Sequence, residues 1–253
     1  MFFSLDAACG CNMGKRRQNN EDNFLFLDQH LPEENGGLPE ILTCKSKLGK
    51  RPCFSVFDGL GGENFGESAS FSAAKCQLVM RQKPPRRITP KYLVQMVQQL
   101  NDAVMQCKRE HFTEYMGTTM VSLIFTPWKA HICNVGDSRA YLLRKTNLQQ
   151  LSVDHIAQQP ANSTRKAPLT QSLGLDPEEI TLQPHFASVA LRRGDRFLLC
   201  SDGLTDMLTD AQIAAILQEK TDAKACAEAL IQGALEAGGK DNITVVIMKG
   251  TGE

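Results

Sequence analysis

Acidic residues next to apolar segments are the groups in this sequence best suited to do chemistry. Asp58 follows residues 53–57, an apolar run typical of a buried strand, and precedes a glycine-rich turn that begins at Gly59. Glycine permits sharp bends and close approach to the main chain, so this turn suits a ligand-binding site. Three further acidic positions flank predicted core strands in the same way: Glu21-Asp22, Asp202 and Asp241.

Asp58 taken alone also fits simpler roles. Asp-Gly is a common hairpin dipeptide, so Asp58-Gly59 is compatible with a structural turn. A dinucleotide-binding turn would need a glycine where Asn64 stands. Residues 233–240 resemble a P-loop, but Asp241 replaces the hydroxyl residue and a predicted helix precedes them. We discount both nucleotide-binding motifs and keep the hairpin turn as an alternative.

Convergence of the four acidic positions would create a cation site. At an effective dielectric constant of about 20, each close pair of like charges costs roughly 4 kcal/mol. Protonation or divalent cations must then neutralise the group. Because the donors are all oxygens and include no histidine, the cation would be Mg²⁺ or Mn²⁺. Two such ions would generate a hydroxide and hold a phosphoryl group for in-line attack.

Arg17 lies five residues before Asp22, and its guanidinium is suited to bind phosphate oxygens in a bidentate manner. The competing interpretation is that each acid belongs to a separate turn and that no common site exists. The two interpretations differ in whether the strands converge, which spacing along the chain does not decide.

Composition excludes several classes of protein. The 253 residues suffice for one large domain or two small ones, and 28 basic and 28 acidic side chains give a net charge of zero. This balance gives no indication of a nucleic-acid or membrane partner. Nine cysteines without C-x-x-C spacing indicate a reducing compartment rather than a disulfide framework or a zinc site. With no signal peptide or membrane span, we expect a soluble cytoplasmic protein.

Hydrophobic periodicity predicts a chain that mixes strands and helices. The predicted strands cover residues 4–8, 23–28, 53–57, 118–125, 130–135, 139–143, 148–153, 196–201 and 243–248. The predicted helices cover residues 66–81, a segment that begins at Pro90, 210–218 and 222–237. The basic segment that contains Lys45 and Lys47 is interpreted as a solvated connection. Residues 154–179 show weak periodicity and are predicted to form a surface flap.

Six segments in order resemble the motifs of the metal-dependent serine/threonine protein phosphatases of the 2C type, and of their compact bacterial branch in particular. These segments are Arg17-Gln18-Asn19-Asn20-Glu21-Asp22, Asp58-Gly59-Leu60-Gly61-Gly62, Gly117-Thr118-Thr119, Asn134-Val135-Gly136-Asp137-Ser138-Arg139-Ala140, Ser201-Asp202-Gly203-Leu204-Thr205-Asp206 and Asp241-Asn242-Ile243-Thr244. The resemblance spans essentially the whole chain. It implies an α+β fold with four layers, αββα, in which two stacked antiparallel sheets are flanked by helices on both faces. It also implies one catalytic domain over residues 1–253, with a short flap at about 154–180.

The resemblance further implies roles for the acidic residues. Asp58 would bridge two metal ions, and the Gly59 carbonyl would add a ligand. Asp202 and Asp241 would complete one metal, and Glu21 and Asp22 would hold the other, partly through water. Arg17 would bind the phosphate. A third, weaker metal site would involve Asp202 together with Asp137 and Asp206, although a hairpin-turn role for Asp137 and a helix-start role for Asp206 fit these two residues equally well.

Three departures from the family pattern affect the mechanism and the flap. Leu60 stands where eukaryotic members carry a histidine that protonates the leaving group, so we assign no general acid. His155 is not a departure, since residues 151–155 resemble the family pattern, and it is expected to be a hydrogen-bonded structural residue rather than a catalytic one. Residues 156–170 are shorter than the usual flap, and Gln171 stands where arginine is common.

The expected function is a signalling hydrolase that removes phosphate from phosphoserine and phosphothreonine by attack of a metal-bridging hydroxide. Phosphorylated proteins would be its substrates, a serine/threonine kinase would act in opposition, and the protein would be a monomer. One alternative is a catalytically weak or inactive regulatory binding module of the same fold. Another keeps the chemistry but takes an anti-sigma-factor antagonist or a small phosphoester as substrate.

Overall fold

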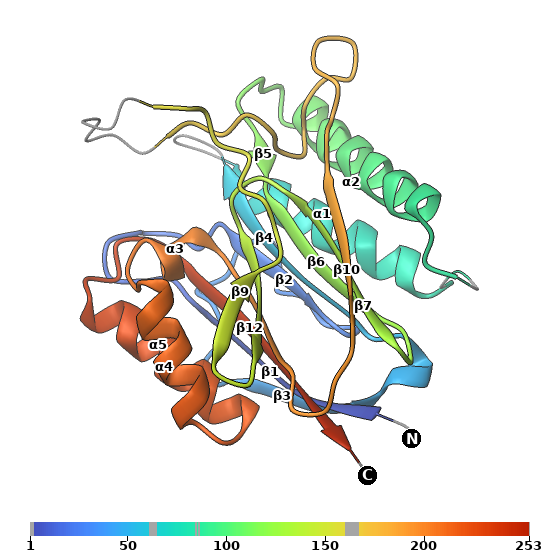
Figure 1. Cartoon of the computed structure of the whole chain (residues 1–253). Coiled ribbons are helices and arrows are strands. Elements are labelled where there is room, and N and C mark those ends of the chain that lie inside the picture. Colours follow the sequence, from blue (N-terminus) through green and yellow to red (C-terminus); the bar gives the residue numbers. More distant parts are fainter. Residues whose placement is uncertain (1–2, 61–64, 84, 86, 160–166, 253) are drawn as a thin grey trace.

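The computed structural model describes residues 3–60, 65–83, 85, 87–159 and 167–252, and its strands form two antiparallel sheets (Figure 1). The first sheet has the order β3 (Leu42–Lys47), β1 (Phe3–Asn12), β12 (Ile243–Gly252), β11 (Arg196–Cys200), β8 (Arg139–Arg144) and β9 (Asn147–Gln150). The second has the order β10 (His185–Ala190), β7 (Lys129–Val135), β6 (Met120–Phe125), β4 (Cys53–Leu60) and β2 (Asp22–Phe26), with the short β5 (Gly117–Thr118) paired to β4.

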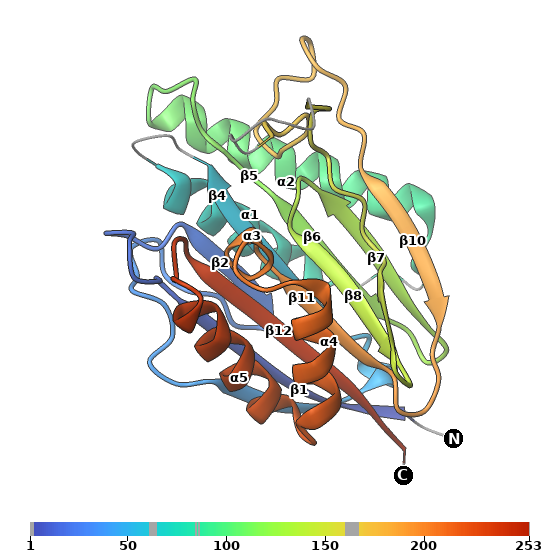
Figure 2. The same cartoon turned by 60° about the vertical axis from the view of Figure 1, so that its left-hand side comes forward.

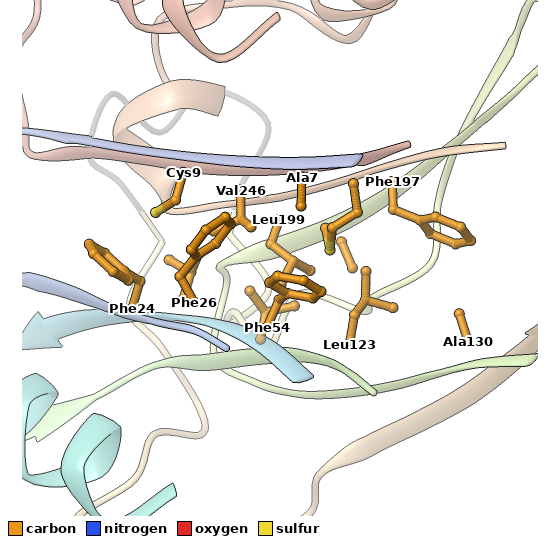
Figure 3. Packing of buried hydrophobic residues seen from close by; sticks show 14 of the residues in the cluster. Ala7, Cys9, Phe24, Phe26, Phe54, Leu123, Ala130, Phe197, Leu199 and Val246 are labelled. Atoms are coloured by element: carbon orange, nitrogen blue, oxygen red, sulfur yellow. The ribbon is translucent and has the colours of Figure 1, made fainter. Parts of the chain in front are cut away.

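The two sheets stack because successive side chains of a strand point to opposite faces, and in the central strands both faces are apolar. In β12, Val246 and Met248 pack in the core between the sheets, whereas Val245 and Ile247 pack against helices on the outer side. Figure 3 shows the inner core, where Phe54 of one sheet lies near Leu199 of the other. A strand that is apolar on both faces must be covered on both faces, and this requirement produces four layers.

Helices cover both outer faces, which confirms the predicted αββα sandwich (Figure 2). Helices α1 (Gly66–Arg81) and α2 (Pro90–Glu110) pack on the second sheet. Helices α4 (Asp210–Glu219) and α5 (Ala223–Glu236) pack on the first, together with the short α3 (Asp202–Thr205). A 3₁₀ turn, η1 (Leu48–Lys50), follows β3.

Local capping determines where two of these helices begin. The Thr89 hydroxyl accepts a hydrogen bond from the Tyr92 amide, 3.1 Å, and Pro90 occupies the first turn of α2. Thr209 and Gln212 form a reciprocal capping box at the start of α4. In the described part of the chain, no helix is both long enough and apolar enough to cross a bilayer.

The basic segment near Lys45 is a strand, so its interpretation as a solvated connection is wrong. Ser4 to Cys9 of β1 pair with the segment Leu42 to Lys47, which forms the edge strand β3. Lys45 and Lys47 are exposed there. Charged side chains on an edge strand discourage pairing with another molecule, so charge and strand formation are compatible here.

The strand boundaries needed further correction. Asp58 lies inside β4, which continues to Leu60, rather than after its end. The sequence patterns gave no indication of β10, because its residues are only partly buried on an edge of the second sheet. Asp206 follows the last residue of α3 and does not start a helix, so the helix-start role for this residue is wrong.

Candidate active site

Asp22 and Asp58 lie directly opposite each other on the neighbouring strands β2 and β4. Phe24 and Val56, two residues from each acid along its strand, face the core between the sheets. Side chains alternate along a strand, so both carboxylates point into the same inter-sheet space at one end of the sandwich. Like charges in such a pair are destabilising. The register therefore provides the convergence that the sequence left undecided for these two residues.

Asp22 is buried and is held by hydroxyl groups of the other sheet. The Ser201 and Thr244 hydroxyls each donate to its Oδ2 atom over 2.7 Å. Burial raises the pKa of Asp22 to about 7, the two hydroxyl bonds oppose this rise, and the nearby charges of Asp241 and Glu21 add to it. Ser201 and Thr244 lie within the motifs but received no predicted role, because a hydroxyl in a strand carries no local signal of its target.

Arg17 is paired with Asp241 across the mouth of this space. Its Nη2 atom donates to Asp241 Oδ2 over 2.7 Å, and both side chains are partly exposed to solvent. The hydrogen bond to Asp241 raises the pKa of Arg17, and the charges of Glu21 and Asp58 act in the same direction. Three carboxylates from separate segments of the chain therefore attract the guanidinium of Arg17.

The loop that carries Arg17 is held close to Asp241 by a glycine. Gly14 has a φ of 81°, and a Cβ atom there would lie 2.2 Å from the Asp241 carbonyl oxygen. The Lys15 amide also donates to the Gly239 carbonyl over 2.7 Å. No larger residue fits at position 14 without moving the backbone.

Asn242 clamps the loop before β2 onto the start of β12. Its Nδ2 atom donates to the carbonyls of Met13 and Asn19, at 2.9 and 3.0 Å. Its Oδ1 atom accepts from the Glu21 amide at 2.8 Å. The sequence indicated only that Asn242 follows an acid, and this positioning role was missed.

Asp58 is fixed through its backbone by two threonines. Thr118 Oγ1 and the Thr119 amide both donate to the Asp58 carbonyl, each at 2.9 Å. The Asp58 amide donates to Thr119 Oγ1 at 3.1 Å. Thr119 Oγ1 also contacts Ser138 Oγ at 2.7 Å, which connects Asp58 to the turn that carries Asp137.

Gly59 is required by close packing rather than by an unusual φ. A Cβ atom at this position would lie 2.1 Å from the Gly66 carbonyl oxygen and 2.6 Å from that of Glu21. The Gly59 amide donates to the same Glu21 carbonyl over 3.1 Å. These contacts bring Glu21 beside the turn after Asp58, although the role of the Gly59 carbonyl as a metal ligand stays a prediction.

Asp202 begins α3 one residue after the end of β11, with Ser201 between them, so this acid stands at a strand-to-helix junction. A Cβ atom at Gly203 would lie 1.9 Å from the Asn242 carbonyl oxygen and 3.4 Å from Asp241 Cβ, which places the two acid-bearing segments in contact. Asp206 is tied to the same turn because its amide donates to the Asp202 carbonyl over 2.7 Å. Asp137 lies buried in the turn between β7 and β8, and the third metal site stays a prediction.

The donor set has the chemistry of a site for hard cations, since its side chains offer carboxylate oxygens and no histidine. Burial is the largest cause of the raised pKa values of Glu21 and Asp22. The negative charge of Asp241 raises both pKa values further. Across the described ranges, no three histidine, cysteine or acidic side chains are arranged closely enough to hold a metal ion by themselves. Glu21 and Asp241 lie close enough to Asp22 for their charges to raise its pKa, and Asp58 acts on the same Arg17 as both of them.

His155 is a hydrogen-bonded residue, as expected from the sequence. The Gly136 amide donates to its Nδ1 atom over 3.0 Å, and its own amide donates to the Gly136 carbonyl over the same distance. Burial lowers the pKa of His155, and the nearby His185 lowers it further. The glycines that follow Leu60, at 61 and 62, lie outside the described residues.

Comparison with known proteins places this geometry in a family. The family model described as Protein phosphatase 2C matches residues 8–166 and 165–243. The chain is 32% identical over 238 residues to serine/threonine phosphatase stp of Listeria innocua, which covers 87% of this chain and 91% of that protein. It is 34% identical over 205 residues to PstP of Mycobacterium tuberculosis, which covers 76% of this chain but 39% of that protein.

Solved structures agree with this match. A crystal structure of the M. tuberculosis serine/threonine phosphatase PstP/Ppp superposes with a TM-score of 0.78 at 28% identity and covers 97% of this chain and 98% of that one. The PstP catalytic domain in complex with two manganese ions gives the same TM-score and identity over 99% and 100% of the two chains. Stp1 of Staphylococcus aureus, at 24% identity and a TM-score of 0.79, shares the fold.

Proposed function

Because the chain belongs to the protein phosphatase 2C family, we propose that it is a metal-dependent phosphatase that hydrolyses phosphoserine and phosphothreonine in proteins. The observation that carries this proposal is the pairing of Asp22 with Asp58 at one end of the inter-sheet space, with Arg17 and Asp241 at its mouth. Relatives that match most of this chain are named serine/threonine phosphatases, which supports the same substrate class.

Two Mn²⁺ or Mg²⁺ ions are the proposed cofactors, with a third, weaker site at Asp137, Asp202 and Asp206. The related PstP catalytic domain is described with two manganese ions, and the oxygen donors of this chain suit the same cations. Asp58 would help to hold both ions and the Gly59 carbonyl would add a ligand. Asp202 and Asp241 would complete one ion, and Glu21 and Asp22 would hold the other, partly through water. Such ions, when bound, supply positive charge and an activated water.

Arg17 would bind the phosphate and orient it toward Asp58. Its guanidinium already lies among the charges of Glu21, Asp58 and Asp241, so a bound phosphate would be placed beside the same acids. The threonines that hold the Asp58 backbone would keep that carboxylate in place during turnover. We assign no general acid, because Leu60 cannot donate a proton.

The cellular setting is also part of the proposal. We infer that the protein acts as a monomer in the cytoplasm, in signalling, on phosphorylated proteins, and in opposition to a serine/threonine kinase. Neither a nucleic acid nor a membrane is a proposed partner. Nothing favours an inactive regulatory module, since all the acids of the candidate site are present.

Replacement of Asp58 tests the proposal. Asp58→Asn should lower kcat/KM for para-nitrophenyl phosphate and for a phosphothreonine peptide at least about 1,000-fold with Mn²⁺, because it removes the central carboxylate. Asp102→Asn, which makes the same change at an exposed position of α2, serves as the control and should leave activity unchanged.

Calorimetric titration with Mn²⁺ should show weaker binding to Asp58→Asn than to the wild-type protein. Loss of the Asp58 and Asp22 repulsion should leave the melting temperature of Asp58→Asn in EDTA unchanged or raised. Full activity of Asp58→Asn would contradict the two-metal assignment, and a wild-type protein that neither binds Mn²⁺ nor hydrolyses either substrate would favour the inactive module.

A further inference from the structure

The connection between α2 and β5, residues 111–116, exposes two aromatic side chains at the end of the molecule that carries the candidate active site. Phe112 is 97% exposed and Tyr115 is 84% exposed, the highest fractions among the exposed large hydrophobic residues of the described chain. Aromatic side chains are enriched at the cores of protein interfaces, and tyrosine is prominent among interface hot spots.

Phe112 is held in a conformation that its side chain disfavours. Helix α2 ends in a Schellman-type arrangement, in which the Thr113 amide donates to the Lys108 carbonyl at 3.2 Å and the Phe112 amide to that of Arg109 at 3.3 Å. Phe112 occupies the left-handed position of this motif with a φ of 51°. Glycine is usual there, and a bulky residue is an outlier. A strained and exposed phenylalanine points to a role other than folding.

The two rings are exposed on an anchored segment. The His111 ring packs on Phe65 with ring centroids 4.7 Å apart, and His111 Nδ1 contacts the Cys107 carbonyl oxygen at 3.0 Å. The Tyr115 amide donates to Thr113 Oγ1 at 3.2 Å. The backbone is therefore fixed beneath the rings, and this segment would lose little conformational freedom when a partner binds them.

This segment adjoins the candidate active site on two sides. Phe65, which contacts His111, precedes Gly66, where a Cβ atom would lie 2.8 Å from the Glu21 carboxylate carbon. Gly117 lies opposite Leu60, two residues beyond Asp58. Figure 2 places the connection between α2 and β5 at the same end of the molecule as the C-terminal end of β4. Measured along the two strands, Tyr115 is therefore at most about four residues, roughly 13 Å, from the level of Asp58.

A hollow of about 500 Å³ is lined by Phe112 and extends to Asp176, near the C-terminal end of the predicted flap. Met105 and Arg109 of α2 line one side, and Asp176 lines the other. The charges around it are mixed, since Lys108 and Arg109 are followed by Glu110 and Glu114. The hollow is thus lined by polar and apolar atoms alike, and the exposed apolar surface of this region is provided by the rings of Phe112 and Tyr115.

We propose that the exposed rings of Phe112 and Tyr115 bind an apolar side chain of the substrate polypeptide, within about four residues of the phosphorylated one. The inference rests on the proposed function and specifies the substrate class: a polypeptide spans the distance from Asp58 to the rings, and a small phosphoester does not. The exposed rings recognise the substrate protein, and the acids act on its phosphate.

The experiment compares two twelve-residue phosphothreonine peptides and para-nitrophenyl phosphate. One peptide carries leucine four residues to each side of the phosphothreonine, and the other carries serine there. The wild-type protein with Mn²⁺ should show a kcat/KM about tenfold higher for the leucine peptide, through a lower KM. The double variant Phe112→Gly, Tyr115→Ser should hydrolyse both peptides equally and should retain its rate on para-nitrophenyl phosphate.

Two measurements distinguish a loss of substrate binding from a loss of folding: the melting temperature of the double variant and the substrate preference of a matched control variant. Phe112→Gly relieves the left-handed strain, so the melting temperature of the double variant should stay the same or rise. Trp128→Ser removes another exposed aromatic ring, 67% exposed, on the hairpin at the opposite end of β6, and should retain the leucine preference. An unchanged preference in the double variant, or equal loss in Trp128→Ser, would overturn the inference. No hydrolysis of para-nitrophenyl phosphate by the wild-type protein would instead overturn the proposed function, and this inference with it.

Discussion

At the scale of single residues, hydrogen bonds from neutral donors hold the carboxylate of Asp22 and the backbone of Asp58 in the candidate site. Asp22 receives two hydroxyl donors over 2.7 Å, and the backbone of Asp58 is held by Thr118 and Thr119. Neutral donors orient a carboxylate without neutralising its charge, so these acids would still attract the proposed cations. Arg17 is the cation that the structure itself supplies to Asp241.

His155 should make stability depend on pH in a defined direction. Burial and His185 lower its pKa in the folded state below the ordinary value of 6.5, and its Nδ1 atom accepts a hydrogen bond only when the ring is neutral. The unfolded chain then binds a proton first as pH falls. The contribution of His155 should be complete above pH 6.5 and should decrease below it, by about 1 kcal/mol for one lost hydrogen bond.

Urea unfolding between about pH 5 and pH 8 measures this effect. His155→Asn keeps an acceptor near the Gly136 amide but does not titrate, so its free energy of unfolding should change less over this range. Equal pH dependence in the two proteins would show that His155 is not the titrating group.

At the scale of elements, helix α2 holds residues 173–175, which lie near the C-terminal end of the predicted flap and are called the flap root below. Asn101, buried on α2, accepts from the Gly174 amide at 2.8 Å and donates to the Leu175 carbonyl at 2.9 Å. The neighbouring Leu173 exchanges hydrogen bonds with Thr118 at 3.1 and 2.8 Å. Because Thr118 also bonds to the Asp58 carbonyl, one continuous set of contacts joins the helix, the flap root and the central acid.

Asn101→Ala should loosen the flap root. Loss of both bonds leaves a buried amide and a carbonyl unsatisfied, which should cost about 1–3 kcal/mol of stability per group. Hydrogen exchange should then show weaker protection at Leu173 and Gly174 than in the wild-type protein. Gln98→Ala, on an exposed face of the same helix, is the control, and equal deprotection in both variants would contradict this role for Asn101.

At the scale of the whole molecule, the four layers bury most of the thiols. Seven of the nine cysteines are buried, Cys44 and Cys76 are half-buried, and all nine are free. Burial raises the pKa of Cys11 to about 12 and that of Cys44 to about 11. Since the thiolate is the reactive form, these side chains are packing groups of the core.

A thiol-reactive dye should distinguish the folded and unfolded states sharply. In the native protein at about pH 8, no more than two thiols should react within minutes, and all nine should react in guanidinium chloride. Fast reaction of a third thiol would indicate that a core layer opens. Cys44→Ser and Cys76→Ser together should abolish the fast phase.

The sequence by itself determined the chemical identity of the candidate site and most of the elements. Asp58 and Asp241 could be selected from local patterns, because a carboxylate beside an apolar strand and glycine is visible within a few residues. Arg17 could be selected because it lies five residues before Asp22. The helix starts at Pro90 and Asp210 were likewise set by local caps. The edge strands β3 and β10 were not found, because a charged or half-buried edge strand lacks the apolar pattern of a central one.

Only the tertiary structure decided which residues meet. The opposition of Asp22 and Asp58, the bonds from Ser201 and Thr244, and the clamp by Asn242 join segments that lie far apart in the sequence. Such contacts depend on strand register and sheet stacking, and a shift of one residue would turn each side chain to the opposite face. The left-handed backbone of Phe112 is set by the hydrogen bonds that end α2, and the sequence around Phe112 does not indicate it. Local patterns therefore specify the groups, and long-range packing specifies their geometry.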